Sequence, residues 1–252
     1  MSATGLLYRL LAPAGARGQL VVLIFHRVLP EPDALRPGEP DLAEFSRQMR
    51  FWARHFQVLP LLEAAQRLAE GRLPAAAACI TFDDGYADNL DVATPVLQAL
   101  GLPATLFVAS GFLDGGVMWN DLLIEALRQA PGTALDLTAL GLGVLHLNAP
   151  GGRAAAAAEL LQRIKRQPLA QRAALAEAVL AASGGVRPTL MLSTAQLRRM
   201  AELDWEIGAH TVRHPILDVL PDEQARQEIR DSKQDLEQLL GQPVRSFAYP
   251  NG

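Results

Sequence analysis

Two adjacent carboxylates stand at the end of a short apolar run in this chain. Asp83 and Asp84 follow residues 79–82, which suit a buried strand because they combine a cysteine, an isoleucine, a threonine and a phenylalanine. Aspartates are depleted from strand interiors, so we expect both at the carboxyl end of this strand, where α/β folds build their sites. Strict alternation would point them to opposite faces, but Gly85 tolerates positive φ and lets the chain turn so that both line one cavity.

A purely structural role is the alternative for these aspartates. Asp84 or Asp88 could cap a helix that begins near Asn89, because carboxylates accept hydrogen bonds from the free N–H groups of a first helical turn. For an isolated Asp-Asp-Gly this role is the commoner one, so a catalytic interpretation needs support from other parts of the chain.

Two histidines provide that support. His210 and His214 lie four positions apart at the end of a strand predicted over residues 206–210. If the chain turns helically there, both imidazoles can face one centre, as in many metal sites. Because the histidines follow a strand just as Asp83 and Asp84 do, a metal site becomes a better interpretation than two unrelated surface histidines.

The elements that position these side chains alternate between strand and helix. A helical pattern at residues 89–100 is flanked by two apolar runs, and strand–helix–strand at this spacing predicts parallel pairing. The fold class is therefore α/β. Strands are predicted at residues 20–25, 79–82, 104–108, 206–210 and 244–248.

Residues 112–200 differ in character from the rest. Two alanine-rich helical stretches at residues 153–166 and 169–182 are divided by Pro168, and residues 133–148 show no clear pattern. We expect this block to be a mostly helical insertion that forms a lid or a side wall.

The totals exclude several classes of protein. Half of the 252 residues are hydrophobic and the net charge is −4, so the chain can bury a sizeable core and carries no basic surface for nucleic acid. No apolar segment is long enough to span a bilayer, and no signal peptide is evident, so we expect a cytoplasmic protein. Cys79 is the only cysteine and is expected to be a buried, inert thiol. The sequence indicates no oligomeric state.

Three separated stretches together resemble the polysaccharide deacetylase family, which is also called carbohydrate esterase family 4 or the NodB-homology domain. They are Thr81-Phe82-Asp83-Asp84-Gly85, His210-Thr211-x-x-His214 and Arg245-x-x-x-Tyr249-Pro250. The resemblance covers roughly residues 20–110 and 203–252. It implies a distorted (β/α) barrel with fewer than eight strands, so that residues 1–252 form a single domain interrupted by the insertion.

The resemblance also implies roles for four side chains. Asp83 would be the general base, and Asp84, His210 and His214 would hold a divalent metal, most often zinc. This agrees with the chemistry of the residues themselves, because one carboxylate and two imidazoles suit zinc and leave coordination positions for water and substrate.

Further roles follow from the same resemblance. Arg245 would pair with Asp83, and the backbone N–H near Tyr249 would help to hold the oxyanion. The family usually supplies its general acid as a histidine near the C-terminus, which this chain does not reach, so we expect a C-terminally truncated, unclosed barrel. His26, directly after the first predicted strand, could replace that acid. Trp119 in the insertion could stack against a sugar, although packing is its more usual role.

Three functions remain open at this point. The first is a metal-dependent hydrolase that removes N-acetyl groups from an N-acetylhexosamine-containing glycan. The second is a hydrolase of a non-sugar amide or cyclic imide, and the third is an inactive, glycan-binding remnant. Glycosidase chemistry is disfavoured, because adjacent aspartates cannot straddle a glycosidic bond at the ~5–9 Å that it requires.

Overall fold

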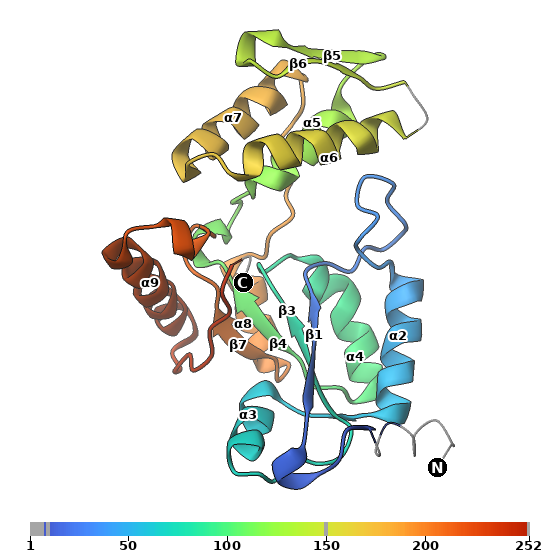
Figure 1. Ribbon diagram of the computed structural model, residues 1–252, viewed down its shortest axis with the longest axis vertical. Coiled ribbons are helices and arrows are strands. Elements are labelled where there is room, and N and C mark those ends of the chain that lie inside the picture. Colours follow the sequence, from blue (N-terminus) through green and yellow to red (C-terminus); the bar gives the residue numbers. More distant parts are fainter. Residues whose placement is uncertain (1–7, 9–10, 149–150, 251–252) are drawn as a thin grey trace. The chain divides into compact units, whose positions relative to one another are not determined.

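The computed structural model describes residues 8, 11–148 and 151–250, which divide into two compact units (Figure 1). The first unit comprises the described residues of Met1–Glu31, Glu39–Asp114 and Met191–Gly252, and the second comprises Pro32–Gly38 and Gly115–Leu190. Among the described helices, none has the length and apolar character needed to cross a membrane.

A parallel sheet organises the first unit. Its strands lie in the order β1-β3-β4-β7, and β2 pairs with the first two residues of β3. The predicted parallel α/β architecture is therefore confirmed. The strands are β1 (Leu20–Phe25), β2 (Gln57–Val58), β3 (Ala77–Phe82), β4 (Thr105–Val108) and β7 (Glu206–Ala209).

Register in this sheet aligns the carboxyl ends of β1 with β3 and of β4 with β7, while β4 extends two residues beyond its pairing with the end of β3. Phe25 at the end of β1 pairs with Phe82 at the end of β3, and Val108 at the end of β4 pairs with Ala209 at the end of β7. All six residues of β3 are buried, which requires both faces of this central strand to be covered, and five of the six are apolar, with Thr81 the exception.

Five α-helices with bounds inside the described residues belong to the first unit, and several pack around one apolar core. Phe45 and Met49 from α2, Leu97 from α4, and Leu236 from α9 meet Phe82 in this core. Asp41 caps α2 by accepting from the N–H of Glu44, and Ser193 forms a capping box with Gln196 at the start of α8. The helices are α2 (Leu42–His55), α3 (Leu61–Ala69), α4 (Thr94–Leu100), α8 (Thr194–Glu202) and α9 (Asp222–Leu240).

The last predicted strand, at residues 244–248, is reduced to a single bridge. Phe247 pairs in parallel with Ala209, and the N–H of Ala248 donates to the carbonyl of Ala209 at 3.0 Å. This contact places the final segment of the chain beside β7. Short single turns complete the first unit, namely η1 (Gly15–Arg17), η2 (Asn89–Ala93), η3 (Ser110–Phe112) and η5 (Leu217–Val219).

The second unit has its own apolar core, to which Leu123, Leu127, Leu160 and Val179 contribute. It corresponds to the predicted insertion with narrower bounds, and it contains an antiparallel hairpin in the stretch that showed no clear pattern in the sequence. Its elements are α5 (Trp119–Gln129), β5 (Ala134–Leu137), η4 (Thr138–Leu140), β6 (Gly143–His146), α6 (Gly152–Lys165) and α7 (Leu169–Ala182).

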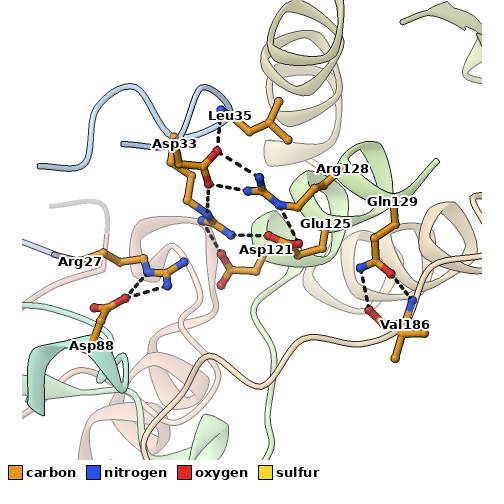
Figure 2. A network of polar contacts seen from close by, with 10 residues as sticks. Arg27, Asp33, Leu35, Asp88, Asp121, Glu125, Arg128, Gln129 and Val186 are labelled. Carbon is orange, nitrogen blue, oxygen red and sulfur yellow. Dashed lines mark hydrogen bonds and ion pairs between the residues drawn. The ribbon is translucent and has the colours of Figure 1, made fainter. Parts of the chain in front are cut away.

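An ion-pair network joins the loop at residues 32–38 to α5 within the second unit (Figure 2). Arg36 is buried and pairs with Asp121, with 2.8 Å between Nη1 and Oδ1. Arg128 binds Asp33 through two nitrogen atoms. The loop is therefore part of this unit although it lies far from the rest of it in sequence.

The two ends of the insertion are fastened together within the first unit by Asp114. Its N–H donates to the carbonyl of Leu192 at 3.1 Å, and its carboxylate accepts from the N–H of Thr194 at 2.8 Å. The segment that leaves the first unit at Asp114 and the segment that returns at the start of α8 are thus joined by hydrogen bonds.

Candidate metal centre

The carboxyl ends of the parallel strands gather the candidate side chains. His26 directly follows β1, Asp83 follows β3, and His210 follows β7. The N–H of Asp83 donates to the carbonyl of Phe25 at 2.8 Å, and the N–H of His210 donates to Val108 at 3.0 Å, so strand pairing continues into the site. Parallel pairing alone therefore brings three residues together that are far apart in sequence.

A sharp turn after β3 brings Asp84 inward. Asp84 has a φ of 77° and Gly85 a φ of 96°, so the alternation of the strand ends between the two aspartates. The carbonyl of Asp84 accepts from the N–H of Ala109 at 3.2 Å. A Cβ added to Gly85 would lie 3.3 Å from Cγ1 of Val108, so a side chain there would be crowded as well as strained. The side chain of Asp84 is almost completely buried.

Asp84, His210 and His214 converge on one point. Their ligand atoms all lie within 4.8 Å of one another. Oδ1 of Asp84 lies 3.6 Å from Nε2 of His210 and 3.2 Å from Nε2 of His214, and the two imidazole centroids are 4.9 Å apart. The structure thus brings together the three residues that the sequence nominated as ligands.

The separations between Oδ1 of Asp84 and the two imidazole nitrogens fit a tetrahedral zinc site. Zinc bonds of about 2.0–2.1 Å at tetrahedral angles place neighbouring ligand atoms about 3.3 Å apart. The two oxygen–nitrogen distances lie close to that value, on either side of it. The donor set of two imidazoles and one carboxylate is also one that zinc accepts.

His210 is held in the tautomer that a metal ligand requires. Its Nδ1 lies 2.9 Å from the carbonyl oxygen of Ala248, so Nδ1 carries the proton and donates, and Nε2 keeps its lone pair. Burial lowers the pKa of His210, which favours the neutral imidazole. The final segment of the chain therefore orients a ligand from β7.

Asp83 lies beside this cluster with its carboxylate free of ion pairs among the described residues. Burial raises the pKa of Asp83, while the nearby His210 and His26 act in the opposite direction. A carboxylate with a raised pKa accepts a proton more readily than an ordinary aspartate. The geometry therefore separates the two aspartates, one turned into the ligand cluster and one left beside it.

His26 is exposed at the same end of the sheet, and its charge affects the pKa of both Asp83 and His210. Its backbone is fixed by the chain after β3. Asn89 donates from Nδ2 to the carbonyl of His26 at 2.9 Å. The structure therefore places His26 where a proton donor to the site could stand.

A buried ion pair supports the residues that follow His26. Arg27 donates from Nε to Asp88 at 2.8 Å, and the other oxygen of Asp88 accepts from the N–H of Val28 at 3.3 Å (Figure 2). Asp88 does not cap a helix with its side chain, which excludes the structural alternative for that residue. The sequence offered Asp88 only as a helix cap and gave no sign of its ion pair with Arg27, because the two residues lie 61 positions apart.

The segment between the two histidines is not the helical turn on which the sequence argument depended. Thr211 has a φ of 65° and His214 a φ of 52°, values that residues with a Cβ seldom adopt. The hydroxyl of Thr211 accepts from the N–H of His214 at 3.1 Å. An irregular loop, rather than a helix, makes the two rings converge.

The side chains of Arg245 and Tyr249, which the sequence also nominated for the site, are both exposed. Arg245 is exposed and precedes Ala248 by three residues, about 10 Å along an extended chain. Within the described part of the chain it forms no ion pair with Asp83. Tyr249 is exposed and its ring contacts Phe247 edge to face.

Trp119 belongs to the second unit. It packs against the apolar core of that unit, and the guanidinium of Arg172 lies 5.0 Å from its ring centroid. This arrangement matches the packing role that the sequence offered as the alternative to sugar stacking, and contact with substrate stays a prediction.

Comparisons with known proteins agree with this geometry. The family model described as "Polysaccharide deacetylase" matches residues 70–136 and 144–252. The curated protein YxkH of Bacillus subtilis (strain 168) is 34% identical over 92 residues, a stretch that covers 36% of this chain and 32% of YxkH. The chain thus aligns with about a third of that relative's length.

Solved structures share the fold. The Streptococcus pyogenes deacetylase PplD, in complex with acetate, superposes with a TM-score of 0.56 and 20% identity over 92% of this chain and 74% of PplD. IcaB from Ammonifex degensii superposes with a TM-score of 0.56 and 21% identity over 96% of this chain and 76% of IcaB.

Proposed function

The chain belongs to the polysaccharide deacetylase family, and from this membership and the site geometry we propose that it is a metal-dependent hydrolase of N-acetyl groups on an N-acetylhexosamine-containing glycan. The observation that carries the proposal is the convergence of Asp84, His210 and His214 with Asp83 free beside them. The deacetylase PplD was solved in complex with acetate, which is the product that such a reaction releases, and this supports the same reaction class.

The three members of the cluster share one task in this reaction. Asp84, His210 and His214 would hold the metal, and their donor set favours zinc. When bound, the metal supplies Lewis acidity, which polarises the acetyl carbonyl and acidifies water. Ala248 keeps Nε2 of His210 available by accepting the hydrogen bond from the proton-bearing Nδ1.

Asp83 serves as the general base. It accepts a proton from the attacking water, and the burial that raises its pKa strengthens it for this step. His26 serves as the general acid and donates a proton to the departing amine, since an unprotonated amine is a poor leaving group. The backbone N–H near Tyr249 helps to hold the oxyanion.

Paired substitutions test this assignment. Asp83→Asn should keep the metal and lower acetate release by about 10²–10⁴-fold, because it removes the base alone. His210→Ala should lose the metal, as measured by elemental analysis after dialysis. Asp91→Asn makes the same chemical change as Asp83→Asn at an exposed position and should be fully active.

The substrate class is tested in the same assay. Chitooligosaccharides should release acetate, release should stop with a chelator and return with added zinc, and small non-sugar amides and cyclic imides should not react. Full acetate release by Asp83→Asn would end the proposal.

A further inference from the structure

The loop that carries the metal ligands needs support from outside itself. Two of its residues, Thr211 and His214, have positive φ values that a side chain disfavours. The Thr211 hydroxyl secures the end of the loop at His214, but it makes no contact with the N–H groups of Val212 and Arg213. Another group must therefore hold the middle of the loop.

Glu228 provides this support from α9. Its Oε2 accepts from the N–H groups of Val212 and Arg213, both at 2.9 Å, and its Oε1 accepts from Nε of Arg213 at 2.7 Å. Glu228 is only 3% exposed and lies on the inward face of α9 with Ser232 and Leu236. Successive N–H groups that converge on an anionic oxygen form strong, charge-assisted hydrogen bonds.

The opposite edge of the loop is held by backbone atoms. The N–H of Ser110 donates to the carbonyl of Thr211 at 3.2 Å, and the N–H of Gly111 donates to the carbonyl of Val212 at 3.0 Å. The loop is thus secured between η3 and α9. The carboxylate of Glu228 is the component of this support that a single substitution can remove.

We propose that Glu228 is a positioning residue for metal binding. Its carboxylate holds Val212 and Arg213 so that Nε2 of His210 and Nε2 of His214 already converge on Asp84 before an ion arrives. The inference rests on the proposed function, since it takes these residues to be ligands. Ligands ordered in advance bind more tightly because little ordering remains to oppose binding, and loss of such supporting contacts typically lowers metal affinity by about 10–100-fold.

Competition with a chromogenic chelator tests the proposal on the metal-free full chain, with Zn²⁺ as the probe. Glu228→Gln should weaken Zn²⁺ binding by about 10–100-fold, because the neutral amide oxygen holds the two N–H groups without charge assistance and the amide NH₂ opposes Nε of Arg213. Glu223→Gln makes the same change at an exposed position in the first turn of α9 and should bind as the wild type does. Wild-type affinity in a folded Glu228→Gln variant would overturn the proposal.

A second variant separates positioning from the effect of charge. Arg213→Ala removes the exposed cation that faces Glu228 and leaves both backbone contacts in place. If Glu228 acted only through its negative charge, Arg213→Ala would strengthen Zn²⁺ binding by a factor comparable to the loss in Glu228→Gln. Positioning predicts no such gain, so a gain of that size would also overturn the proposal.

Amide hydrogen exchange provides a readout that needs no metal. In the metal-free protein the Val212 and Arg213 amides should be protected, and Glu228→Gln should accelerate their exchange while Glu223→Gln does not. If the wild type takes up no Zn²⁺, the proposed function is refuted. The role of Glu228 in holding the loop is refuted separately, by amide exchange in Glu228→Gln that is the same as in the wild type. If Glu228→Gln fails to fold, Glu228→Asp keeps the charge, shortens the side chain, and carries both measurements with the same expected losses.

Discussion

Nδ1 of His210 lies 2.9 Å from the carbonyl oxygen of Ala248. The two residues belong to neighbouring extended segments, because the N–H of Ala248 donates to the carbonyl of Ala209. The partner that fixes the tautomer of this ligand is thus a main-chain atom, which no side-chain substitution can remove. The orientation of the imidazole therefore depends on the pairing of the final segment with β7.

The proposed acid should be detectable from its dependence on the leaving group. His26→Gln should lower deacetylation of an N-acetylated sugar by about 10²–10⁴-fold, because the amine leaves only when protonated. Hydrolysis of 4-nitrophenyl acetate should fall far less, because a nitrophenolate leaves without a proton. Measuring kcat/KM for both substrates decides the matter, with the exposed His146→Gln as the control. Equal losses on both substrates would exclude His26 as the acid.

The Arg27–Asp88 pair should be important for stability. Asp88→Ala leaves a guanidinium buried without its partner and should lower the free energy of unfolding by about 3–5 kcal/mol. Urea denaturation of both single variants and of the double variant measures the coupling, and the double variant should lose less than the sum of the singles. Glu202→Ala breaks the exposed pair with Arg199 and should cost at most about 1 kcal/mol. Additive losses at Arg27 and Asp88 would contradict the prediction.

Cys79 should resist alkylation in the folded protein. Burial raises the pKa of this thiol to about 12, so at pH 8–9, where a free thiol starts to ionise at its ordinary pKa of 9.0, Cys79 stays protonated. Iodoacetamide should label the chain in urea and not in buffer, and mass spectrometry reads the result directly because the chain has no other cysteine.

The same shift in the pKa of Cys79 makes a prediction about stability. Since the folded pKa exceeds the unfolded one, the stability that the neutral thiol contributes is complete below about pH 9 and is lost as the pH rises through about 12. In Cys79→Ala this component of the alkaline decline should be absent. Rapid labelling of the native protein at pH 8 would contradict both statements about this thiol.

Gly208 in β7 should not tolerate a side chain. A Cβ there would lie 2.4 Å from Cδ1 of Phe107 and 2.7 Å from Oγ of Ser246. Gly208→Ala should therefore lower the free energy of unfolding by about 1–3 kcal/mol through overpacking. Gly38→Ala is the control, because the structure leaves open space there. Equal stability of the two variants in urea would show that the sheet adjusts without cost.

The sheet could be predicted because burial on both faces demands apolar residues at every position. The run at β3 satisfies this demand apart from Thr81. The strand β1 does not, because it lies at the end of the strand order and exposes Val22 and Ile24, although its sequence is apolar throughout. Parallel pairing then fixes what stands at the carboxyl ends of both strands. The grouping of Asp84 with His210 and His214 follows from the same rule. The hairpin β5–β6 could not be predicted, since each of its strands has only four residues and the alternation of Leu135 and Leu137 with exposed neighbours is too short to identify a strand.

Features that depend on packing were beyond the sequence argument. Arg245 lies away from the carboxyl end of β7 because an extended chain rises by about 3.3 Å per residue. A resemblance between short sequence patterns does not predict this distance. One sequence signal for Glu228 exists, because an acidic residue on the inward face of an amphipathic helix is unusual. Its partners could not be predicted, because they lie on a loop whose position does not follow from sequence spacing.

Asp114 closes the insertion at its base by binding both Leu192 and Thr194. The stretch between the two ends can then grow, shrink or be exchanged while β4 and β7 keep their pairing. Chimaeras that swap residues 115–190 together with the loop at residues 32–38, whose Arg36 pairs with Asp121, for the corresponding segments of a relative should retain the parallel sheet and the metal-ligand cluster. Relatives can therefore differ in this block while the strands that carry the ligands stay the same.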